Sequence, residues 1–497
     1  MINFRIYKIL STFSKKDWND FGKFVKAFDI SSGRKYQPLL IGIKKYSKRL
    51  KTLKNIPIAE IFKKAYNKTF SNQTIFNRQN EFLNLLKKYI GNIEYKKNEL
   101  LETYFYLEGL LSRNLLDIFS FEYKRKKNTM EKYYYDENSY KVLSQIIGEY
   151  VVCSILINSE KNNSGNADSN LKLKYLDFVL AEILSVLYKN GSEAQILRYY
   201  KLVKNNFILD FINLLNTDVF FEELEKQNEP IFIIPLIHYY IFKALSDMDC
   251  KKYIDKAKRI YFMNENSFPE EFKLHIYGKI MSYYNMKINK GEPKYYKDLL
   301  LLYKRKLKQN LVSDLSEHYL VYNNVFCEYV IIGLLEKQYK WVEMVIKKYS
   351  PLLPEDIRED EYTLAMIRLY SAKKEYKKII EILKSRKIQN QKHYLDSIRF
   401  KLISYYELEE FEECYKEIDN ARHYYMYNKN KVLNERISAF KKFLDGFSKI
   451  LNYRMNPFNK DLNDIFYDIK SLGFPKDDWI YKKIQEISEK NSNILLL

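Results

Sequence analysis

The chain has 497 residues, of which 46% are hydrophobic, and it carries a formal net charge of +21. Apolar content at this level supplies a buried core, which excludes an intrinsically disordered chain. Only 13 glycines and 10 prolines are present. Because sheets and their hairpins need frequent turn residues, this scarcity favours a fold of packed helices.

The positive charge is concentrated at the N-terminal end. Residues 1–100 contain 22 Lys and Arg against 7 Asp and Glu, whereas the rest of the chain contains 62 against 56. A basic module of this kind can bind a polyanion such as nucleic acid. The alternative is a bias in composition, because Lys outnumbers Arg 68 to 16 and specific phosphate recognition more often uses the planar guanidinium of Arg.

The first residues lack the long apolar core and the cleavage site of a signal peptide. Apolar runs such as residues 151–157 and 231–237 are shorter than the ~20 residues that cross a bilayer. No two of the four cysteines lie within 70 residues of each other, and the sequence predicts them to be buried, reduced thiols. We therefore expect a cytoplasmic protein without a membrane span.

The N-terminal segment predicts several short helices. Ser14 can cap a helix that runs from Lys15 to about Phe28, and Asp17 favours the positive end of its dipole. The next helices are expected at residues 39–50, 58–66 and 71–90.

The middle of the chain predicts longer helices and helix pairs. Two long helices are expected over 97–128 and 131–158, and a polar loop rich in Asn and Ser follows at 158–170. Three helix pairs come next, at 171–189 with 192–205, 230–245 with 250–263, and 270–288 with 293–309. The last helices are expected at about 430–451, 459–472 and 476–490.

Three C-terminal segments share one pattern: an amphipathic run, a short charged turn, an aromatic residue and a second amphipathic run. The turn aromatics are Tyr339, Tyr376 and Phe411, separated by 37 and 35 residues. This spacing is close to the ~34-residue period of helix–turn–helix repeats, which stack on their neighbours to bury their apolar faces. The three units occupy roughly 323–350, 360–387 and 393–427.

These units resemble degenerate tetratricopeptide repeats. On the first helix, where that family has a small residue, this chain has Val330, Ile367 and Leu402 in the three units. On the second helix, where the family usually has Ala, it has Val342, Ile379 and Cys414. A later aromatic of the first helix is matched by Tyr370 and Tyr405, but Gly333 replaces it in the first unit. Separately, residues 13–28 and 61–90 resemble the start of large uncharacterised bacterial proteins, a resemblance that implies no activity.

Together these patterns predict an all-α fold: a superhelical array of antiparallel helix pairs, a tetratricopeptide-like α-solenoid, with a helical N-terminal module. Residues 1–95 would form the basic module and residues 96–320 a helical-hairpin array. Residues 321–428 would form the repeats, and residues 429–497 would cap them.

The resemblance implies a binding groove, because the first helix of each tetratricopeptide repeat lines the concave face of the array. The residues it places there are Glu361, Arg368, Asp396, Arg399 and Tyr406, with Cys327, Ile331, Leu334, Leu364 and Ile403. Two guanidinium groups in a groove could hold the carboxylates of a peptide. The alternative is an ordinary ion pair between adjacent helices, such as Arg368 with Glu361 or Asp396.

Residues 58–90 predict a helix, a short turn and a second helix. The second helix would present Asn77 and Arg78 near its start, as a nucleic-acid recognition helix does. The lysines that would contact phosphates are Lys63, Lys64, Lys68, Lys87 and Lys88. Any two amphipathic helices joined by a short turn give the same pattern, so a purely structural role stays open.

No motif for catalysis, cofactors or metals is present. The five histidines show none of the metal-binding spacings, and GxxxxGKS/T, GxGxxG and GxSxG are all missing. We therefore expect a non-catalytic scaffold that binds a protein or peptide. The alternative is a regulator whose residues 1–95 contact nucleic acid while the helical body senses a partner. The sequence leaves the oligomeric state open.

Overall fold

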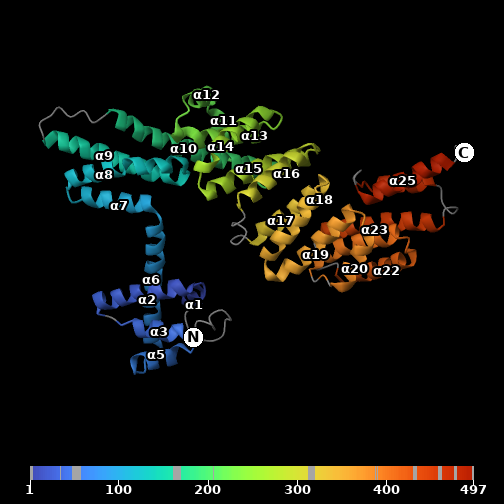
Figure 1. The fold of residues 1–497 in the computed structure, drawn as a ribbon, viewed down its shortest axis with the longest axis horizontal. Coiled ribbons are helices and arrows are strands. Elements are labelled where there is room, and N and C mark those ends of the chain that lie inside the picture. The colour runs from blue at the N-terminus through green and yellow to red at the C-terminus, as the bar shows by residue number, and fades with distance from the viewer. Residues whose placement is uncertain are drawn as a thin grey trace. The chain divides into compact units, whose positions relative to one another are not determined.

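The computed structural model describes residues 4–33, 35–46, 57–160, 169–204, 206–311, 319–386, 388, 390–428, 434–456, 462–474 and 478–494. Every regular element within these ranges is a helix, and no strand occurs in them (Figure 1). The predicted all-α class is therefore confirmed. The chain divides into two compact units: Met1–Ala194 with Val203–Phe242 and Ala257–Pro269, and Gln195–Leu202 with Lys243–Lys256 and Glu270–Leu497.

The N-terminal helices enclose one buried cluster that is centred on the fully buried rings of Phe21, Phe62 and Phe82. These helices are α1 (Phe4–Ser11), α2 (Lys15–Ser32), α3 (Gln37–Lys44), α5 (Ile58–Tyr66) and α6 (Asn72–Lys97). The helix α5 has its predicted bounds, whereas α2 and α6 extend beyond theirs. Within the expected helix at 39–50, residues 47–50 lie outside the described ranges.

The helix α2 begins at the predicted cap. The Ser14 hydroxyl accepts from the backbone N–H of Asp17 at 3.2 Å, and the Asp17 carboxylate accepts from the backbone N–H of Ser14 at 2.8 Å. This reciprocal capping box satisfies two N–H groups that the helix itself leaves without partners. The hydrogen bonds from Ser14 lower the pKa of the Asp17 carboxyl. At its other end α2 stops at Gly33, which has a positive φ of 67°.

Two predicted boundaries in the middle of the chain are wrong. The single helix expected over 97–128 is broken into α7 (Glu99–Leu111) and α8 (Leu116–Met130) by Asn114, whose φ is 55°. Asn enters this left-handed region more easily than most residues, because its short side chain can hydrogen-bond locally. The expected break near residue 190 does not occur, because α10 (Ser169–Tyr199) is continuous.

The other helices of the first unit surround an aromatic cluster. They include α9 (Tyr140–Glu160), which starts nine residues later than expected, α11 (Phe207–Leu214), α12 (Asp218–Gln227) and much of α13 (Ile233–Ser246). In the cluster the Phe221 and Tyr239 rings stack with centroids 3.8 Å apart, and Tyr188 meets Phe221 edge-on at 5.1 Å. The sequence did not predict α11 or α12. Residues 161–168 of the expected polar loop lie outside the described ranges.

A buried polar cluster joins three elements of this unit. The Glu137 carboxylate, in a short 3-10 helix before α9, bonds to the ring Nε2 of His238 on α13 at 2.8 Å and to the Lys189 ammonium on α10. Burial alone would raise the pKa of Glu137, but the bonds from His238 and Lys189 outweigh it and lower this pKa to about 2. The cluster therefore holds an ionised carboxylate whose side chain is only 11% exposed.

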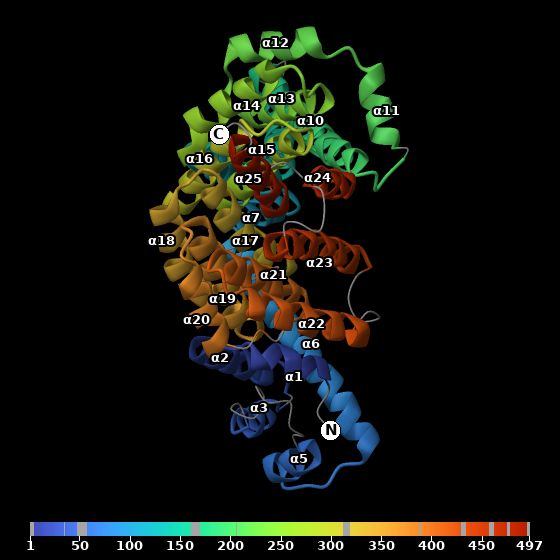
Figure 2. The same cartoon turned by 90° about the vertical axis from the view of Figure 1, so that its right-hand side faces the viewer.

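The second unit is a succession of helix pairs, several of which match the expected ones closely. After α14 (Lys251–Asn264), which the two units share, they are α15 (Glu270–Asn289) with α16 (Tyr295–Lys308), α17 (Tyr319–Leu335) with α18 (Tyr339–Tyr349), α19 (Glu355–Ala372) with α20 (Tyr376–Ser385), and α21 (Gln391–Glu407) with α22 (Phe411–Asn428). Three further helices follow: α23 (Asn434–Met455), α24 (Leu462–Ser471) and α25 (Trp479–Ile494). Figure 2 shows α23 beside α21 and α22, on which it packs.

The three repeated pairs turn in the same way. The second helix of each pair begins at the predicted turn aromatic, Tyr339, Tyr376 or Phe411. Two residues earlier the backbone takes a positive φ of 54°, 59° and 61°, at Lys337, Lys374 and Glu409. The N–H that follows bonds back to the carbonyl five residues earlier: Gln338 to Gly333 at 2.8 Å, Glu375 to Tyr370 at 2.9 Å and Glu410 to Tyr405 at 2.9 Å. This pattern is the Schellman motif, which ends a helix while satisfying its last carbonyls.

The six residues that replace small ones of the tetratricopeptide pattern, five aliphatic residues and Cys414, all lie in the interior. Their exposed fraction is 0% in every case: Val330, Ile367, Leu402, Val342, Ile379 and Cys414. The structure also explains why glycine stands at position 333, because a Cβ there would lie 2.8 Å from Cζ3 of Trp341 on α18. In the next pair, Tyr370 takes the place of Gly333 and Lys378 takes the place of Trp341. In the first pair the large ring is therefore Trp341 on the second helix, whereas in the next pair it is Tyr370 on the first helix.

The left-handed turn of the α19–α20 pair generates a stability prediction. A side chain with a Cβ is strained at positive φ, whereas Gly is not. Replacing Lys374 with Gly should therefore stabilise the chain by about 0.5–1 kcal/mol, after allowing for the extra entropy that Gly has in the unfolded state. The matched control is Lys377→Gly, three residues further on inside α20, which should destabilise by about 1 kcal/mol. Urea unfolding of the two variants would contradict this explanation if Lys374→Gly lowered the midpoint as Lys377→Gly does.

The Glu137 cluster generates a pH-dependent prediction. Glu137→Gln leaves Lys189 and His238 without their carboxylate, and it should cost roughly 3 kcal/mol of unfolding free energy at neutral pH. Because folding lowers the pKa of Glu137, its stabilisation is complete above the ordinary value of 4.5 and is lost as the pH falls toward 2. Urea midpoints measured at pH 7 and pH 3 should show the gap between wild type and variant narrowing at pH 3. A gap that stays constant contradicts the prediction.

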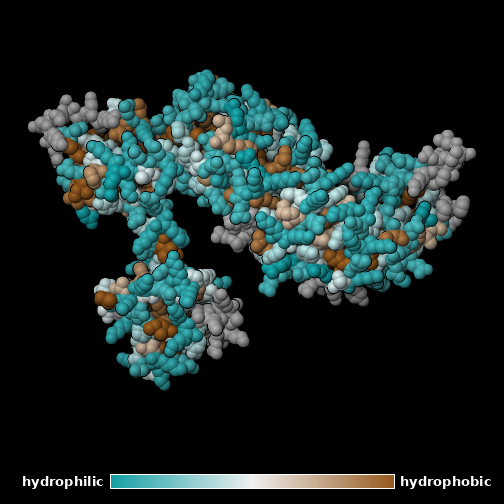
Figure 3. All heavy atoms as spheres, viewed as in Figure 1, coloured by the Kyte–Doolittle hydropathy of each residue, from teal (hydrophilic) through white to brown (hydrophobic). Residues whose placement is uncertain are grey.

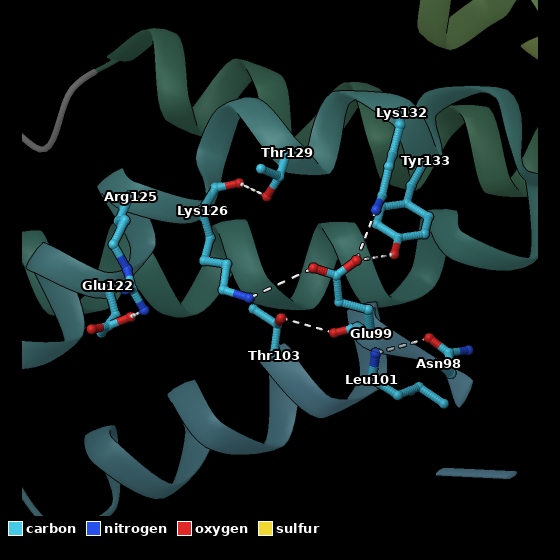
Figure 4. A network of polar contacts seen from close by, with 10 residues as sticks. All are labelled: Asn98, Glu99, Leu101, Thr103, Glu122, Arg125, Lys126, Thr129, Lys132 and Tyr133. Atoms are coloured by element: carbon cyan, nitrogen blue, oxygen red, sulfur yellow. Dashed lines mark hydrogen bonds and ion pairs between the residues drawn. The ribbon is translucent and has the colours of Figure 1, made fainter. Parts of the chain in front are cut away.

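A second carboxylate in the same unit provides the control. Glu99 at the start of α7 lies 2.7 Å from the Lys132 ammonium and 3.4 Å from the Tyr133 hydroxyl, but its side chain is 52% exposed (Figure 4). Exposed ion pairs contribute little because water and salt screen them. Glu99→Gln should therefore shift the midpoint far less than Glu137→Gln.

Candidate functional site

A pocket of about 620 Å³ lies within the second unit. The first helices of the three repeated pairs, α17, α19 and α21, supply most of its lining, and the start of α25 completes it. Its apolar wall consists of Ile331, Leu334 and Leu335 on α17, Phe400 and Ile403 on α21, and Trp479 on α25. Four charged residues also line it: Arg368, Asp396, Arg399 and Asp478. The pocket thus combines an apolar surface with two guanidinium groups.

Arg368 projects from α19 and is shared between two neighbouring helices. One of its guanidinium nitrogens lies 3.2 Å from the Cys327 sulfur on α17, and another lies 3.6 Å from the Asp396 carboxylate on α21. Burial raises the pKa of the Cys327 thiol, although the guanidinium opposes this shift. The Asp396 side chain is 42% exposed, so this ion pair is open to water and to exchange with another anion.

Arg399 projects from α21 and pairs with a different aspartate. Its guanidinium pairs with the Asp478 carboxylate and lies 5.0 Å from the centre of the Phe443 ring on α23. The same Asp478 carboxylate accepts from the backbone N–H of Ile480 at 2.9 Å, so it also caps α25. Next to it, the Trp479 indole donates to the Glu407 carboxylate at 2.7 Å. These bonds fix both the guanidinium and the indole that line the pocket.

The structure brings together only part of the groove expected from the sequence. Arg368, Asp396 and Arg399 line the pocket, but Glu361 and Tyr406 do not. Glu361 is buried and its carboxylate bonds to His393 at 2.9 Å. Tyr406 is also buried, edge-on to Trp479 at 5.2 Å, and burial raises the pKa of its hydroxyl to about 12. Both side chains support the packing of neighbouring helices.

Sequence reasoning missed half of the residues that line the pocket. On the repeated pairs it missed Leu335, Ser371, Ala372 and Phe400, which adjoin predicted residues on the same helices, and outside the pairs it missed Asp478 and Trp479. Asp478 and Trp479 lie at the start of the last described helix and reach the pocket because α23, α24 and α25 fold back on one another and on α21. The pair of aspartates before Trp479 is a recognisable helix-capping signal. Nothing in its spacing from Arg399 indicates that the two would meet.

The N-terminal lysines are distributed over two places. Lys63, Lys64 and Lys68 line a hollow of about 770 Å³ at the end of α5, with Glu60, Asn67 and Thr69. Lys87 and Lys88 are exposed on the second half of α6. Three of the five expected phosphate contacts are therefore gathered at one concave surface.

The start of α6 is arranged differently from a recognition helix that points into solvent. Asn77 is exposed, and its amide oxygen accepts from Gln73 at 3.1 Å. Arg78 is half-buried, with its guanidinium 5.8 Å from the centre of the Tyr36 ring, and Gln79 is buried. Of Asn77 and Arg78, the two residues that the second helix was expected to present near its start, only Asn77 is exposed.

In the parts of the chain that the structure describes, no group of three or more His, Cys, Asp or Glu side chains is placed to hold a metal ion. Within the same parts, one helical segment, Glu137–Asn158, is long and apolar enough to cross a membrane by length and composition alone. Core helices of soluble proteins pass the same test, and this segment packs on α7 and α8 of its own chain.

Comparison with protein-family models, with curated proteins and with solved structures found no match to this chain.

Proposed function

We propose that the repeated pairs belong to a tetratricopeptide-like superhelical array, and that the chain is a non-catalytic scaffold that binds a protein or peptide segment in the pocket of its second unit. The observation that carries the proposal is the composition of this pocket. An apolar wall of six side chains lies beside two guanidinium groups in an open hollow of about 620 Å³. Peptide-binding surfaces combine these two features, because apolar contacts supply affinity and fixed polar groups supply orientation.

The charges of the pocket indicate what the peptide carries. Each guanidinium is already balanced by one aspartate, Arg368 by Asp396 and Arg399 by Asp478. A ligand carboxylate can replace Asp396 at little cost, because Asp396 is exposed and its pairing distance is long at 3.6 Å. Asp478 is only 12% exposed and also caps α25, so its pairing is harder to disturb. We therefore propose a peptide with an apolar side chain and a free carboxylate, held mainly by Arg368.

Binding of peptides to the intact chain tests this proposal. A library of labelled peptides with free C-terminal carboxylates, and the same peptides with amidated ends, can be compared by fluorescence polarisation. We expect the carboxylate series to bind more tightly. Leu335→Asp, which places a charge on the apolar wall, and Arg368→Ala should each weaken binding by roughly tenfold.

Matched substitutions outside the pocket control for general effects. Met344 on α18 is about as exposed as Leu335, at 42% against 46%, and Arg422 on α22 pairs with an aspartate only at the surface. Met344→Asp and Arg422→Ala should leave binding unchanged. Equal binding by wild type and Leu335→Asp would overturn the proposal.

A second candidate function, nucleic-acid binding, is favoured by the exposed lysines of the first helices. Besides the three lysines at the end of α5, the outer face of α2 carries Lys15, Lys16, Lys23 and Lys26, all exposed. On a helix these positions lie within about 100° of one another, opposite the buried Trp18, Phe21 and Val25. We propose that this surface contacts phosphates while the repeats hold a partner.

The salt dependence of binding tests this second candidate. The full chain should bind labelled duplex or single-stranded DNA with an affinity that falls steeply with salt. Changing Lys63, Lys64 and Lys68 together to Ala should weaken binding and reduce the slope of log K against log salt by about 3. The same triple change at Lys340, Lys347 and Lys348 on α18 is the control. Equal slopes for the two triple variants would contradict a role for the α5 lysines.

A further inference from the structure

The helix α10 has two apolar faces, and only one of them is buried. Phe178, Ala181, Ser185 and Tyr188 face the interior of the first unit. On the opposite side, Leu173, Leu176, Ile183 and Val186 are between 54% and 59% exposed. The outer face of a surface helix is normally polar. Figure 3 shows apolar surface around the first turns of α10, in a molecule whose visible surface is mainly hydrophilic.

The apolar residues of this outer side follow a heptad pattern. Steps of three and four residues alternate along Leu173, Leu176, Leu180, Ile183, Leu187 and Asn190. This is the spacing of the a and d positions in a coiled coil, where a second helix covers them. The seam contains 18 residues, Leu173 to Asn190, and extends over about 25 Å of helix axis. None of these six side chains is buried by the chain itself.

We propose that α10 pairs with α10 of a second copy of this chain, in antiparallel orientation about a two-fold axis. Such an interface is isologous: the same surface is used by both copies. The seam is self-complementary in this arrangement, because Leu176 would meet Leu187 of the other copy and Leu180 would meet Ile183. The proposal is independent of the peptide pocket, which lies in the second unit.

The positions beside the seam favour the antiparallel orientation. When Leu173 is taken as position a, Val179 and Val186 occupy g positions. Leu184 and Gly191 then occupy e positions. Val186 is 54% exposed, whereas Leu184 and Gly191 are buried in the chain's own interior. A parallel pair brings g residues against e residues of the partner. Reversing one helix brings g against g, so Val179 of one copy would meet Val186 of the other.

Charge complementarity identifies the occupant as a second copy. Two further g positions lie at the ends of the seam: the exposed Lys172 and the exposed Glu193. In an antiparallel pair centred between Leu180 and Ile183, Lys172 of each copy lies beside Glu193 of the other. Opposite charges thus meet at both ends of the apolar seam, and like charges never do.

The helix α10 is already folded in the single chain, before any pairing. Helices in proteins owe most of their stability to tertiary packing, so a free peptide with this seam would first have to fold. In this chain, packing of the opposite face already holds α10 as a continuous helix. Association therefore costs no ordering of the backbone, and more of the free energy of burying the leucines remains for binding.

Sedimentation equilibrium of the full chain tests the proposal. We expect a mass of twice 60.2 kDa for wild type and a single-chain mass for Ile183→Glu, with unchanged helical circular dichroism. The matched control is Phe207→Glu on α11, which places the same charge at an apolar side chain that is 92% exposed but outside the seam. This control should remain a dimer. A monomeric wild type, or a dimer that Ile183→Glu leaves intact, overturns the proposal.

Charge reversal tests the orientation separately. Lys172→Glu alone and Glu193→Lys alone each place like charges at both ends of the seam, and each should weaken dimerisation by roughly tenfold. An equimolar mixture of the two variants should form a heterodimer of wild-type stability, because every Glu then meets a Lys. In a parallel pair the mixture would instead set the carboxylate introduced by Lys172→Glu against Asp177 of the other copy. Failure of the mixture to restore the dimer therefore overturns the antiparallel arrangement.

Discussion

The repeated part of the second unit depends on a single backbone constraint: between the two helices of each pair, one residue must enter the left-handed region. Lys337, Lys374 and Glu409 do so, although their Cβ atoms make this conformation cost about 1 kcal/mol or more each. Burial across each pair outweighs this cost, since each helix of the three pairs carries one of the six fully buried residues named above. The same reversal occurs at Asn114, Gly291 and Asn310.

This constraint is also what creates the pocket. Because each pair reverses direction after a similar number of residues, the first helices α17, α19 and α21 become neighbours, and α19 packs on both of the others. Arg368 and Arg399 are 31 residues apart in the sequence, yet they line one hollow. Bulky interior side chains fill the space between the helices of each pair, and the helices α23 to α25 then close one side of the pocket with Trp479.

Local signals in the sequence predicted local structure well. The helix cap at Ser14, the helix at 58–66 and the start of three helices at a turn aromatic follow from interactions within a few residues. The break at Asn114 was missed because Asn inside an apolar pattern is also tolerated in a helix. At the pocket, the resemblance to tetratricopeptide repeats placed Arg368 and Arg399 on one side of the pairs. It could not show that Tyr406 would be covered by Trp479, because that contact depends on how the last three helices return.

The helix α10 shows why an apolar pattern alone did not reveal an interface. A helix with apolar residues all round is normally buried all round, and the sequence does not say which face its own chain covers. Here the covered face holds small residues such as Ala181, Ser185 and Ser192 beside two aromatic rings and Leu184, whereas Leu173, Leu176 and Ile183 remain exposed. Small residues allow the interior to approach the α10 backbone closely. Gly191 is the extreme case, since a Cβ there would lie 2.6 Å from Ile212. The exposed leucines, with Ile183 and Val186, are then the apolar surface of α10 that the chain leaves for another molecule to cover.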